Sequence, residues 1–380
     1  MIKNPLLVLE SFGQSIWLDY LRRNSLENGE FKQWIDQDGV SGLTSNPSIF
    51  EKAIAGSNDY DKAIHALVLG GKSIQEIYQT LTVNDIRLAA DLFRPTYDRL
   101  DGADGFVSLE VSPDLAHDTA GTIAEARQLW MAVNRPNLFI KVPATKEGLP
   151  AIQQLIGEGI NINITLLFGL PRYREVAEAY LLGLENLAAN GRPLGRVASV
   201  ASFFLSRIDV LVDPMLEKLK SDTGPGAEIA TSLHGQAAIA SAKVACQVYQ
   251  EIFSGGRFRK LHRKGARTQR LLWASTGTKN PEYSDVKYVE PLIGPDTINT
   301  LPVETLNAYR NHGRPVPGLA EGSREACDVL EKLRLVGIDM DAVTQQLEDE
   351  GVTKFSKAFE QSMAALRKKQ ATSMQTPMSR

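Results

Sequence analysis

The chain alternates between short apolar segments and longer segments with helical periodicity. Residues 172–190 illustrate the longer kind. Their apolar positions recur at steps of three and four residues, at Val176, Ala177, Tyr180, Leu181, Leu184 and Leu187. This spacing places the six side chains on one face of a helix, where a core can bury them.

The short segments are rich in β-branched residues and predict eight strands. These strands are expected at residues 16–19, 40–44, 106–111, 138–142, 160–166, 197–203, 271–275 and 286–290. Strands that alternate with helices pair in parallel through right-handed crossovers. Eight such units predict an α/β fold, a single (β/α)8 TIM barrel of roughly 250 residues before insertions. An open doubly wound sheet is the rival architecture, but no glycine-rich turn of the dinucleotide-binding type follows any of these segments.

The chain has 380 residues, which exceeds the length of a plain barrel, so we expect helical insertions. Residues 60–100 are one candidate, between the second and third strands. The polar segment at about 220–264, between the sixth and seventh strands, is another. We expect the barrel to occupy residues 1–366. Residues 367–380 are polar and unpatterned, which predicts a disordered tail.

Composition and charge exclude several classes of protein. The formal net charge is -3, which gives no indication of a nucleic-acid or anionic-membrane partner. Basic residues gather at 257–270, and such a run is either a solvated face or an attraction for a phosphorylated ligand. No apolar run reaches the length of about 18 residues that a bilayer requires. The start lacks the ordered features of a secretory signal, so we expect a cytoplasmic protein.

Lys141 is the most unusual residue in the strand pattern. Residues 138–143 read LFIKVP, so this lysine has apolar neighbours on both sides within a predicted central strand. A charged ammonium group is costly to bury there. Burial favours the neutral amine, which can attack a ketone and form an imine, or Schiff base. The alternatives are an ion pair at the barrel rim and a side chain that snorkels to solvent at the strand end.

Polar residues also occur at the ends of the other predicted strands. They include carboxylates, amides and hydroxyls, namely Asp19, Asn46, Glu110, Asn163, Thr165, Ser202 and Ser275. In residues 161–165 the polar side chains alternate with apolar ones, so they point to one face. The carboxyl ends of barrel strands meet at one face of the molecule, where active sites of this fold lie. The set therefore predicts an active site around Lys141.

The segment after the seventh strand reads STGTK from Ser275 to Lys279 and is suited to binding phosphate. Small residues let backbone N–H groups approach an anion, and Lys279 adds a cation. Arg207 could supply a guanidinium group to the same anion, or it could instead form a surface ion pair with Asp209.

The chain gives no indication of a metal site. Cys246 and Cys327 are far apart, which disfavours both a disulfide framework and a zinc site. The histidines are isolated, without ligand partners at helical or strand spacing. His117, shortly after the third predicted strand, is the only one near the expected site.

Three segments together resemble a known family. Residues 44–48 (TSNPS), 139–145 (FIKVPAT) and 159–168 (GININITLLF) are similar to signature segments of transaldolases. Residues 107–111 (VSLEV) fit the acidic strand of the same family. The resemblance runs in order from about residue 16 to residue 292, and the overall length is similar to that of the longer bacterial members.

The resemblance implies transfer of a dihydroxyacetone unit from a ketose phosphate to an aldose phosphate in the pentose phosphate pathway. The ketose would be sedoheptulose 7-phosphate or fructose 6-phosphate, and the aldose glyceraldehyde 3-phosphate or erythrose 4-phosphate. Lys141 would form the Schiff base. Asp19 would exchange the proton of the hydroxyl beside the scissile bond, and Glu110 would move protons through a water that Thr165 orients.

The resemblance also implies the binding residues. Asn46 and Asn163 would bind the hydroxyls of the dihydroxyacetone unit. Ser202, Phe204 and Ser275 would line the site, and Arg207 would bind phosphate. It implies no cofactor and no metal, sugar phosphates as the partners, no nucleic acid or membrane, and a monomer or homodimer.

One position departs from the family pattern. Shorter transaldolases have an arginine two residues after the serine of the seventh strand, where this chain has Gly277. Lys279 is the nearest cation and a candidate replacement.

Two other functions stay open. One is an aldolase that uses the same lysine but releases free dihydroxyacetone. The other is a protein without catalytic activity that binds sugar phosphates on a barrel fold.

Overall fold

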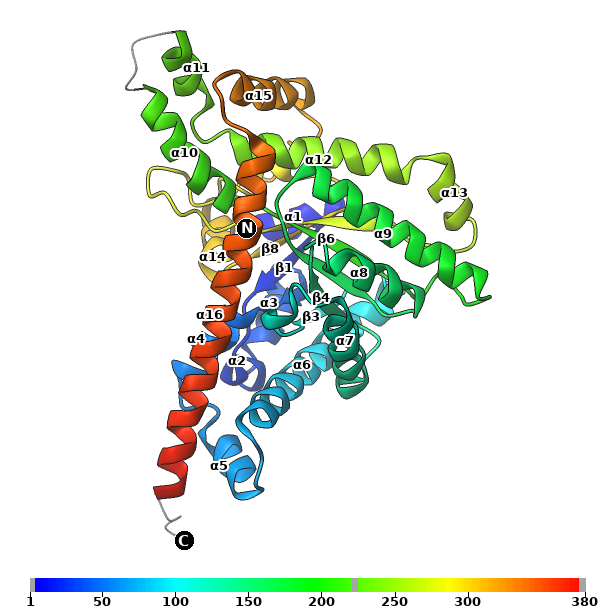
Figure 1. Ribbon diagram of the computed structural model, residues 1–380, viewed down its shortest axis with the longest axis vertical. Helices are drawn as coiled ribbons and strands as arrows, with labels where there is room; N and C mark the ends of the chain where they lie inside the picture. Colours follow the sequence, from blue (N-terminus) through cyan, green and yellow to red (C-terminus); the bar gives the residue numbers. More distant parts are fainter. Residues whose placement is uncertain (1–3, 221–224, 376–380) are drawn as a thin grey trace.

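The computed structural model describes residues 4–220 and 225–375, which form a closed barrel surrounded by helices (Figure 1). Each strand pairs in parallel with the next, and β8 closes the barrel on β1. The strands are β1 (Gln14–Asp19), β2 (Val40–Thr44), β3 (Val107–Glu110), β4 (Leu138–Pro143), β5 (Ile162–Leu167), β6 (Ser199–Phe204), β7 (Gln269–Ala274) and β8 (Thr297–Leu301). The predicted (β/α)8 barrel is confirmed.

The eighth strand was predicted in the wrong place. Residues 286–289 form turns that lead into a short 3-10 helix, η3 (Glu290–Leu292), and the strand follows at Thr297–Leu301. Val286, Tyr288 and Val289 are buried, so their apolar character reflects packing rather than strand pairing. The true strand was missed because its threonines and asparagine are buried polar residues, each held by hydrogen bonds from or to other buried groups.

Helices follow the strands in chain order. Before β1 lie α1 (Pro5–Leu9) and η1 (Glu10–Phe12), and after β8 lie α14 (Val303–His312), α15 (Ser323–Leu335) and α16 (Met340–Gln375). Between β1 and β4 lie α2 (Arg23–Glu27), α3 (Glu30–Asp38), α4 (Pro47–Ala55), α5 (Asp61–Leu69), α6 (Ile74–Arg99), η2 (Pro113–Leu115) and α7 (Thr119–Val133). Between β4 and β7 lie α8 (Gly148–Gly157), α9 (Leu170–Ala189), α10 (Ser206–Lys220), α11 (Pro225–Leu233), α12 (Ala237–Phe253) and α13 (Gly256–His262). Within the described ranges, no helix combines the length and the apolar character needed to cross a membrane.

The segments that exceed a plain barrel are helical. Helices α5 and α6 lie in residues 60–100, and α11, α12 and α13 lie in residues 220–264, as far as that segment is described. Helix α12 packs against α15 and α9, so its alanine-rich face is buried between helices. This burial explains why α12 forms a packed helix within a segment whose sequence is largely polar.

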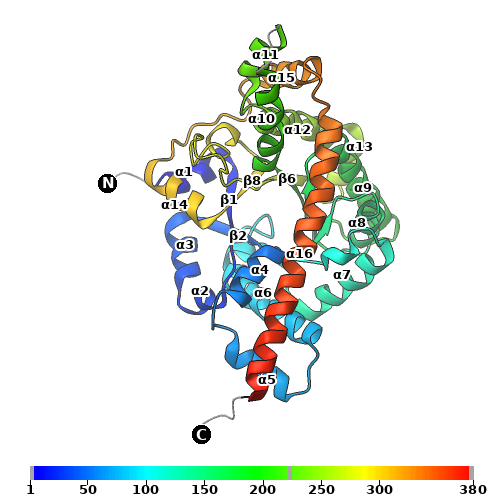
Figure 2. The same cartoon turned by 60° about the vertical axis from the view of Figure 1, so that its left-hand side comes forward.

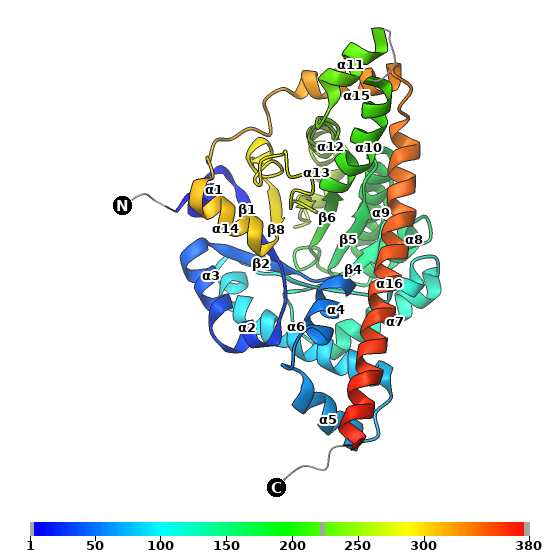
Figure 3. The same ribbon diagram turned by 90° about the vertical axis from the view of Figure 1, so that its left-hand side faces the viewer.

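The segment predicted as a disordered tail is helical where the structure describes it. Helix α16 continues to Gln375, so residues 367–375 are helical, whereas residues 376–380 lie outside the described part of the chain. Leu366 is buried, and Lys369 Nζ donates to the backbone oxygen of Ser57 and pairs with Asp61. These contacts hold the end of α16 against α5, and they could not be inferred from the polar sequence of the segment itself (Figure 3).

The first two strands meet at an unusually close contact. A Cβ atom added to Gly42 in β2 would lie 2.4 Å from Cε2 of Trp17 in β1, so only glycine fits there. The Trp17 ring is fully buried, and its Nε1 donates to Asp104 Oδ1 at 2.7 Å. This packing fixes the register in which Asp19 of β1 lies beside Thr44 of β2.

Candidate active site

A cavity of about 880 Å³ opens at the carboxyl ends of the barrel strands. Most of the residues that the sequence singled out line it, namely Asp19, Asn46, Lys141, Thr165, Ser202, Phe204, Arg207, Ser275 and Lys279. Two others, Glu110 and Asn163, do not line the cavity but contact residues that do. The fold therefore brings together side chains that are separated by up to 260 residues in the chain, counted from Asp19 to Lys279.

Lys141 and Glu110 form an ion pair in the barrel wall. Lys141 Nζ donates to Glu110 Oε2 and to the backbone oxygen of Ser45, both at 2.9 Å. The two side chains are only 5% and 4% exposed. Parallel pairing of β3 with β4 sets Glu110 directly opposite Lys141, and pairing of β4 with β5 sets Lys141 opposite Asn163. The sequence left two structural interpretations of Lys141, an ion pair at the barrel rim and a side chain that snorkels to solvent. The burial of the side chain excludes the second.

The pair is suited to exchanging a proton. Burial raises the pKa of Glu110 above its ordinary value, and the charge of Lys141 and its hydrogen bond only partly oppose this rise. A carboxylate with a raised pKa accepts a proton more readily. The pair can therefore interconvert between its ionic form and a neutral amine next to a carboxylic acid.

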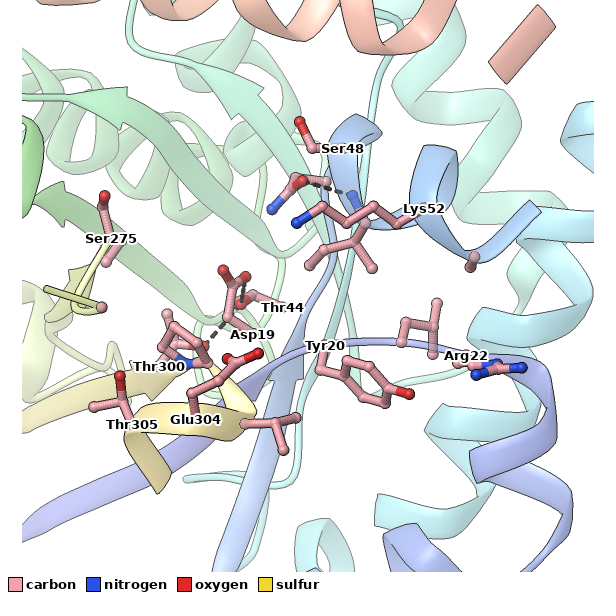
Figure 4. Close-up of a pocket in the computed structure, with 18 of the residues that line it drawn as sticks. Asp19, Tyr20, Arg22, Thr44, Ser48, Lys52, Ser275, Thr300, Glu304 and Thr305 are labelled. Carbon is pink, nitrogen blue, oxygen red and sulfur yellow. Dashed lines mark hydrogen bonds between the residues drawn. The ribbon is translucent and has the colours of Figure 1, made fainter. Parts of the chain in front are cut away.

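Asp19 is a second carboxylate in the cavity wall, at the end of β1, three strands from β4 in the barrel order. Thr44 Oγ1 donates to Asp19 Oδ1 at 2.7 Å and lies 2.8 Å from Thr300 Oγ1 (Figure 4). Burial raises the pKa of Asp19, and the Thr44 hydrogen bond and the charges of Lys141, Lys279 and Arg207 counteract it. Asp19 can thus serve as a base whose proton affinity is higher than that of a solvent-exposed aspartate.

The amide of Asn163 has both of its polar atoms engaged within the wall. Nδ2 donates to Ser108 Oγ at 3.0 Å, and Oδ1 accepts from Ser202 Oγ at 2.6 Å. Asn163 is fully buried, and Ser202 is the member of this chain of hydrogen bonds that lines the cavity. Thr165 differs, because its buried Oγ1 has no hydrogen-bond partner among the described residues and can bond a ligand.

Arg207 points into the cavity rather than toward Asp209. Its guanidinium carbon lies 5.5 Å from the ring centre of Phe204, and its buried Nη1 has no hydrogen-bond partner in the described part of the chain. Asp209 instead pairs with Lys287 and accepts from Tyr288. Burial lowers the pKa of Arg207, but a guanidinium group keeps its charge at neutral pH.

Two residues of the predicted phosphate loop face the same cavity as Arg207. Ser275 has a left-handed φ of 54°, and its hydroxyl lies 2.9 Å from that of Ser206, one residue before Arg207. Lys279 is exposed at the cavity rim, and its charge lowers the pKa of Asp19. Arg207, Ser275 and Lys279 together form a region of the cavity that suits an anionic group.

The remaining candidates lie away from the cavity. In the basic run, Arg257 pairs with Glu178 and Glu185 on the outer face of α9, and Arg270 donates to Ser15 at the opposite end of the barrel. The run is therefore a solvated, ion-paired face. His117 is exposed and lies near Glu147. Within residues 4–220 and 225–375, no three His, Cys, Asp or Glu side chains lie close enough together to hold a metal ion.

Sequence reasoning missed several residues that line the cavity. Asn46 caps α4 by accepting from the backbone N–H of Ile49, and the same helix carries Ser48 and Lys52 into the cavity (Figure 4). The only signal for Ser48 was its place in the TSNPS segment. Glu304 follows β8, whose position was predicted wrongly. Phe355 comes from α16, whose sequence carries no feature that indicates a site.

A closed β/α barrel with a buried lysine–glutamate pair and a second carboxylate at the carboxyl ends of its strands has the architecture of a barrel enzyme. Comparison with known proteins identifies the family. The family model described as "Transaldolase/Fructose-6-phosphate aldolase" matches residues 16–366. The chain belongs to this family.

Full-length relatives support the same assignment. A protein named transaldolase from Trichodesmium erythraeum is 48% identical over 374 residues, which cover 97% of this chain and 98% of the relative. A second transaldolase, from Thiobacillus denitrificans, is 48% identical, and the match covers 93% of this chain and 97% of the relative. A third, from Mycolicibacterium smegmatis, is 46% identical, and the match covers 96% of this chain and 97% of the relative. The chain is therefore an enzyme of the transaldolase type, a transferase.

The Lys141–Glu110 pair predicts how stability depends on pH. In Lys141→Met, Glu110 loses the partner that opposes the rise of its pKa. A carboxyl group whose pKa is higher in the folded state stabilises the fold at low pH, and this stability is lost as the pH rises. We expect the free energy of unfolding of Lys141→Met to fall by up to about 1.4 kcal/mol per pH unit, relative to wild type, above about pH 4.3.

Denaturant titrations of both proteins between about pH 5 and about pH 8 measure this difference. The matched control is Lys141→Met combined with Glu110→Gln, which lacks the carboxyl group and should lose most of the added pH dependence. The pH dependence of stability that remains in the double variant comes from Asp19, because the charge of Lys141 also lowers the pKa of Asp19. If the single and the double variant show equal slopes, Glu110 does not titrate in this way.

Proposed function

We propose that the chain catalyses the transaldolase reaction through a Schiff base on Lys141. It transfers a dihydroxyacetone unit from sedoheptulose 7-phosphate or fructose 6-phosphate to glyceraldehyde 3-phosphate or erythrose 4-phosphate. The observation that carries the proposal is the direct contact of Lys141 Nζ with Glu110 Oε2 beside a cavity that Asp19 also lines. Imine chemistry needs a neutral amine and a group that exchanges protons with it, and this pair provides both.

The first half of the reaction cleaves the donor. Lys141 gives its proton to Glu110 and attacks the ketone carbon of the ketose phosphate. Glu110 then protonates the hydroxyl of the carbinolamine, which leaves as water and gives the protonated imine. Asp19 removes the proton of the hydroxyl beside the scissile carbon–carbon bond. The bond breaks, its electrons move to the imine nitrogen, and an aldose phosphate leaves the enamine behind.

The second half forms the product. The enamine carbon attacks the aldehyde of the acceptor, and Asp19 returns its proton to the new hydroxyl group. Water then adds to the imine, with Glu110 as the base and Thr165 Oγ1 as a hydrogen-bond partner for this water. The bond from carbon to Lys141 breaks, and the free ketose phosphate is released. Two carboxylates in different surroundings can carry out these separate proton transfers.

The positions of the side chains support a set of binding roles. Asn46 and Ser202 bind the hydroxyls of the dihydroxyacetone unit, and Asn163 acts through its hydrogen bond from Ser202. Arg207, Ser275 and Lys279 bind the phosphate group, with Lys279 in place of the arginine that the shorter relatives have. Phe204 packs beside Arg207.

The setting of the enzyme is part of the same proposal. The reaction belongs to the pentose phosphate pathway, and we place it in the cytoplasm, where sugar phosphates are the partners. The proposal includes a monomer or a homodimer as the state of the enzyme.

An acceptor assay separates a transferase from an aldolase. With fructose 6-phosphate as donor, product formation should depend on added erythrose 4-phosphate, because the enamine has no other partner that resolves it quickly. The measurement follows both sedoheptulose 7-phosphate and free dihydroxyacetone over time. Release of dihydroxyacetone at an undiminished rate without acceptor would favour the aldolase that the family description also includes.

The anion-binding region predicts which variants lose phosphate recognition. Arg207→Met should reduce kcat/KM for fructose 6-phosphate by about 10–100-fold, since a hydrogen bond to a charged group contributes about 1.5–3 kcal/mol. Lys279→Met should have a smaller effect, because Lys279 is exposed.

The test of this prediction compares fructose 6-phosphate with unphosphorylated fructose for each variant. Both substitutions should affect the phosphorylated substrate selectively. Lys72→Met, which removes an exposed lysine from a surface ion pair with Glu76, serves as the control. An equal loss on both substrates would place the phosphate elsewhere.

A further inference from the structure

Phe355 of α16 forms a part of the cavity wall that neither the strands nor their loops supply. The side chain is 3% exposed, and its ring centre lies 6.0 Å from Lys141 Nζ and 5.8 Å from the guanidinium carbon of Arg207. The Phe204 ring lies 5.5 Å from the same guanidinium carbon. Phe355 therefore borders both the amine that forms the imine and the cation assigned to phosphate.

Helix α16 reaches this position through a close approach to the barrel. Gly351 lies one turn before Phe355, and a Cβ atom there would lie 2.8 Å from Leu166 Cδ2 and 3.7 Å from Arg207 Nη1. Glu348, on the preceding turn, pairs with Arg172 of α9 at 3.3 Å, and both side chains are largely buried. These contacts fix the helix beside β5 and α10, and Figure 2 shows α16 running along the length of the molecule.

The position of Phe355 matters because the enamine has two fates. Attack of its carbon on an aldehyde gives transfer. If a water molecule beside that carbon instead relays the proton of Asp19 to it, the enamine becomes the imine of dihydroxyacetone. Water then adds to the imine carbon, the bond to Lys141 breaks, and free dihydroxyacetone leaves. Both fates use one water molecule to hydrolyse the final imine, so they differ in the protonation of the enamine carbon, and release is suppressed where water is kept from that carbon.

We propose that Phe355 is a specificity-determining residue that keeps water away from the enamine carbon of the adduct on Lys141 and so favours transfer over release of dihydroxyacetone. This inference rests on the proposed function. The ring is apolar and buried, its centre lies 6.0 Å from Nζ, and it fills space beside the adduct that water would otherwise occupy. Phe204 is the other aromatic side chain of this wall and lies beside Arg207, whereas Glu110, Thr165 and Ser202 bear groups that bind water.

The test compares wild type with Phe355→Leu and Phe355→Ala. The measured quantity is the rate at which free dihydroxyacetone is released from fructose 6-phosphate without acceptor, divided by the rate of transfer to erythrose 4-phosphate. We expect this ratio to rise about tenfold in Phe355→Ala and by less in Phe355→Leu, because leucine still fills part of the space. A substitution that only disturbed the fold would lower both rates together and leave the ratio unchanged.

Phe359→Leu is the matched control. Phe359 lies one turn further along α16, packs edge-on against Tyr78 at 5.2 Å, and does not line the cavity. The Phe359→Leu substitution should leave the ratio of dihydroxyacetone release to transfer at the wild-type value. Thermal unfolding of each variant confirms that the protein compared is folded.

The outcomes separate the inference from the function beneath it. If wild type transfers the three-carbon unit but the ratio stays within about twofold of wild type in both Phe355 variants, Phe355 does not exclude water and the inference is wrong. The same holds if Phe359→Leu raises the ratio as much as Phe355→Leu does. If wild type shows no transfer, the proposed function itself fails.

Discussion

The ion pair between Lys141 and Glu110 is the interaction on which the site depends. Two charges can be buried in the barrel wall because each is the other's partner and the Ser45 carbonyl accepts a further hydrogen bond from Lys141. The same contact allows a proton to move from the amine to the carboxylate, and burial assists this by raising the pKa of Glu110. The contact that makes a lysine tolerable in an apolar strand is thus also the contact on which the proposed imine formation relies.

The other polar residues of the barrel divide into two groups. Asn163, Ser108, Thr44 and Thr300 bond to one another or to site residues, and so they remove the cost of burying polar groups in the wall. Thr165 Oγ1 and Arg207 Nη1 are buried without a partner among the described residues, and both belong to residues that line the cavity. The polar groups named here are therefore either paired within the wall or left free toward the cavity that a sugar phosphate would fill.

The sequence was sufficient to predict the barrel and most of the site, because both depend on local patterns. Apolar runs located β1 to β7, and polar residues at strand ends met in the cavity because parallel strands share one carboxyl edge. The pattern failed where burial and secondary structure diverge, as in residues 286–290, which are buried without being a strand, and in β8, which is a strand despite its polar side chains. It also failed for Phe355 and Lys369, because an apolar or charged residue on a helix does not reveal which distant surface the helix covers.

The central claim is that Lys141 holds the substrate covalently. The most direct measurement is borohydride reduction in the presence of fructose 6-phosphate, followed by mass spectrometry of the peptides from wild type and from Lys141→Met. The account predicts a stable adduct on the peptide that contains Lys141 in wild type, and none in the variant. An adduct on another lysine, or no adduct in wild type under conditions where the enzyme is active, would contradict it.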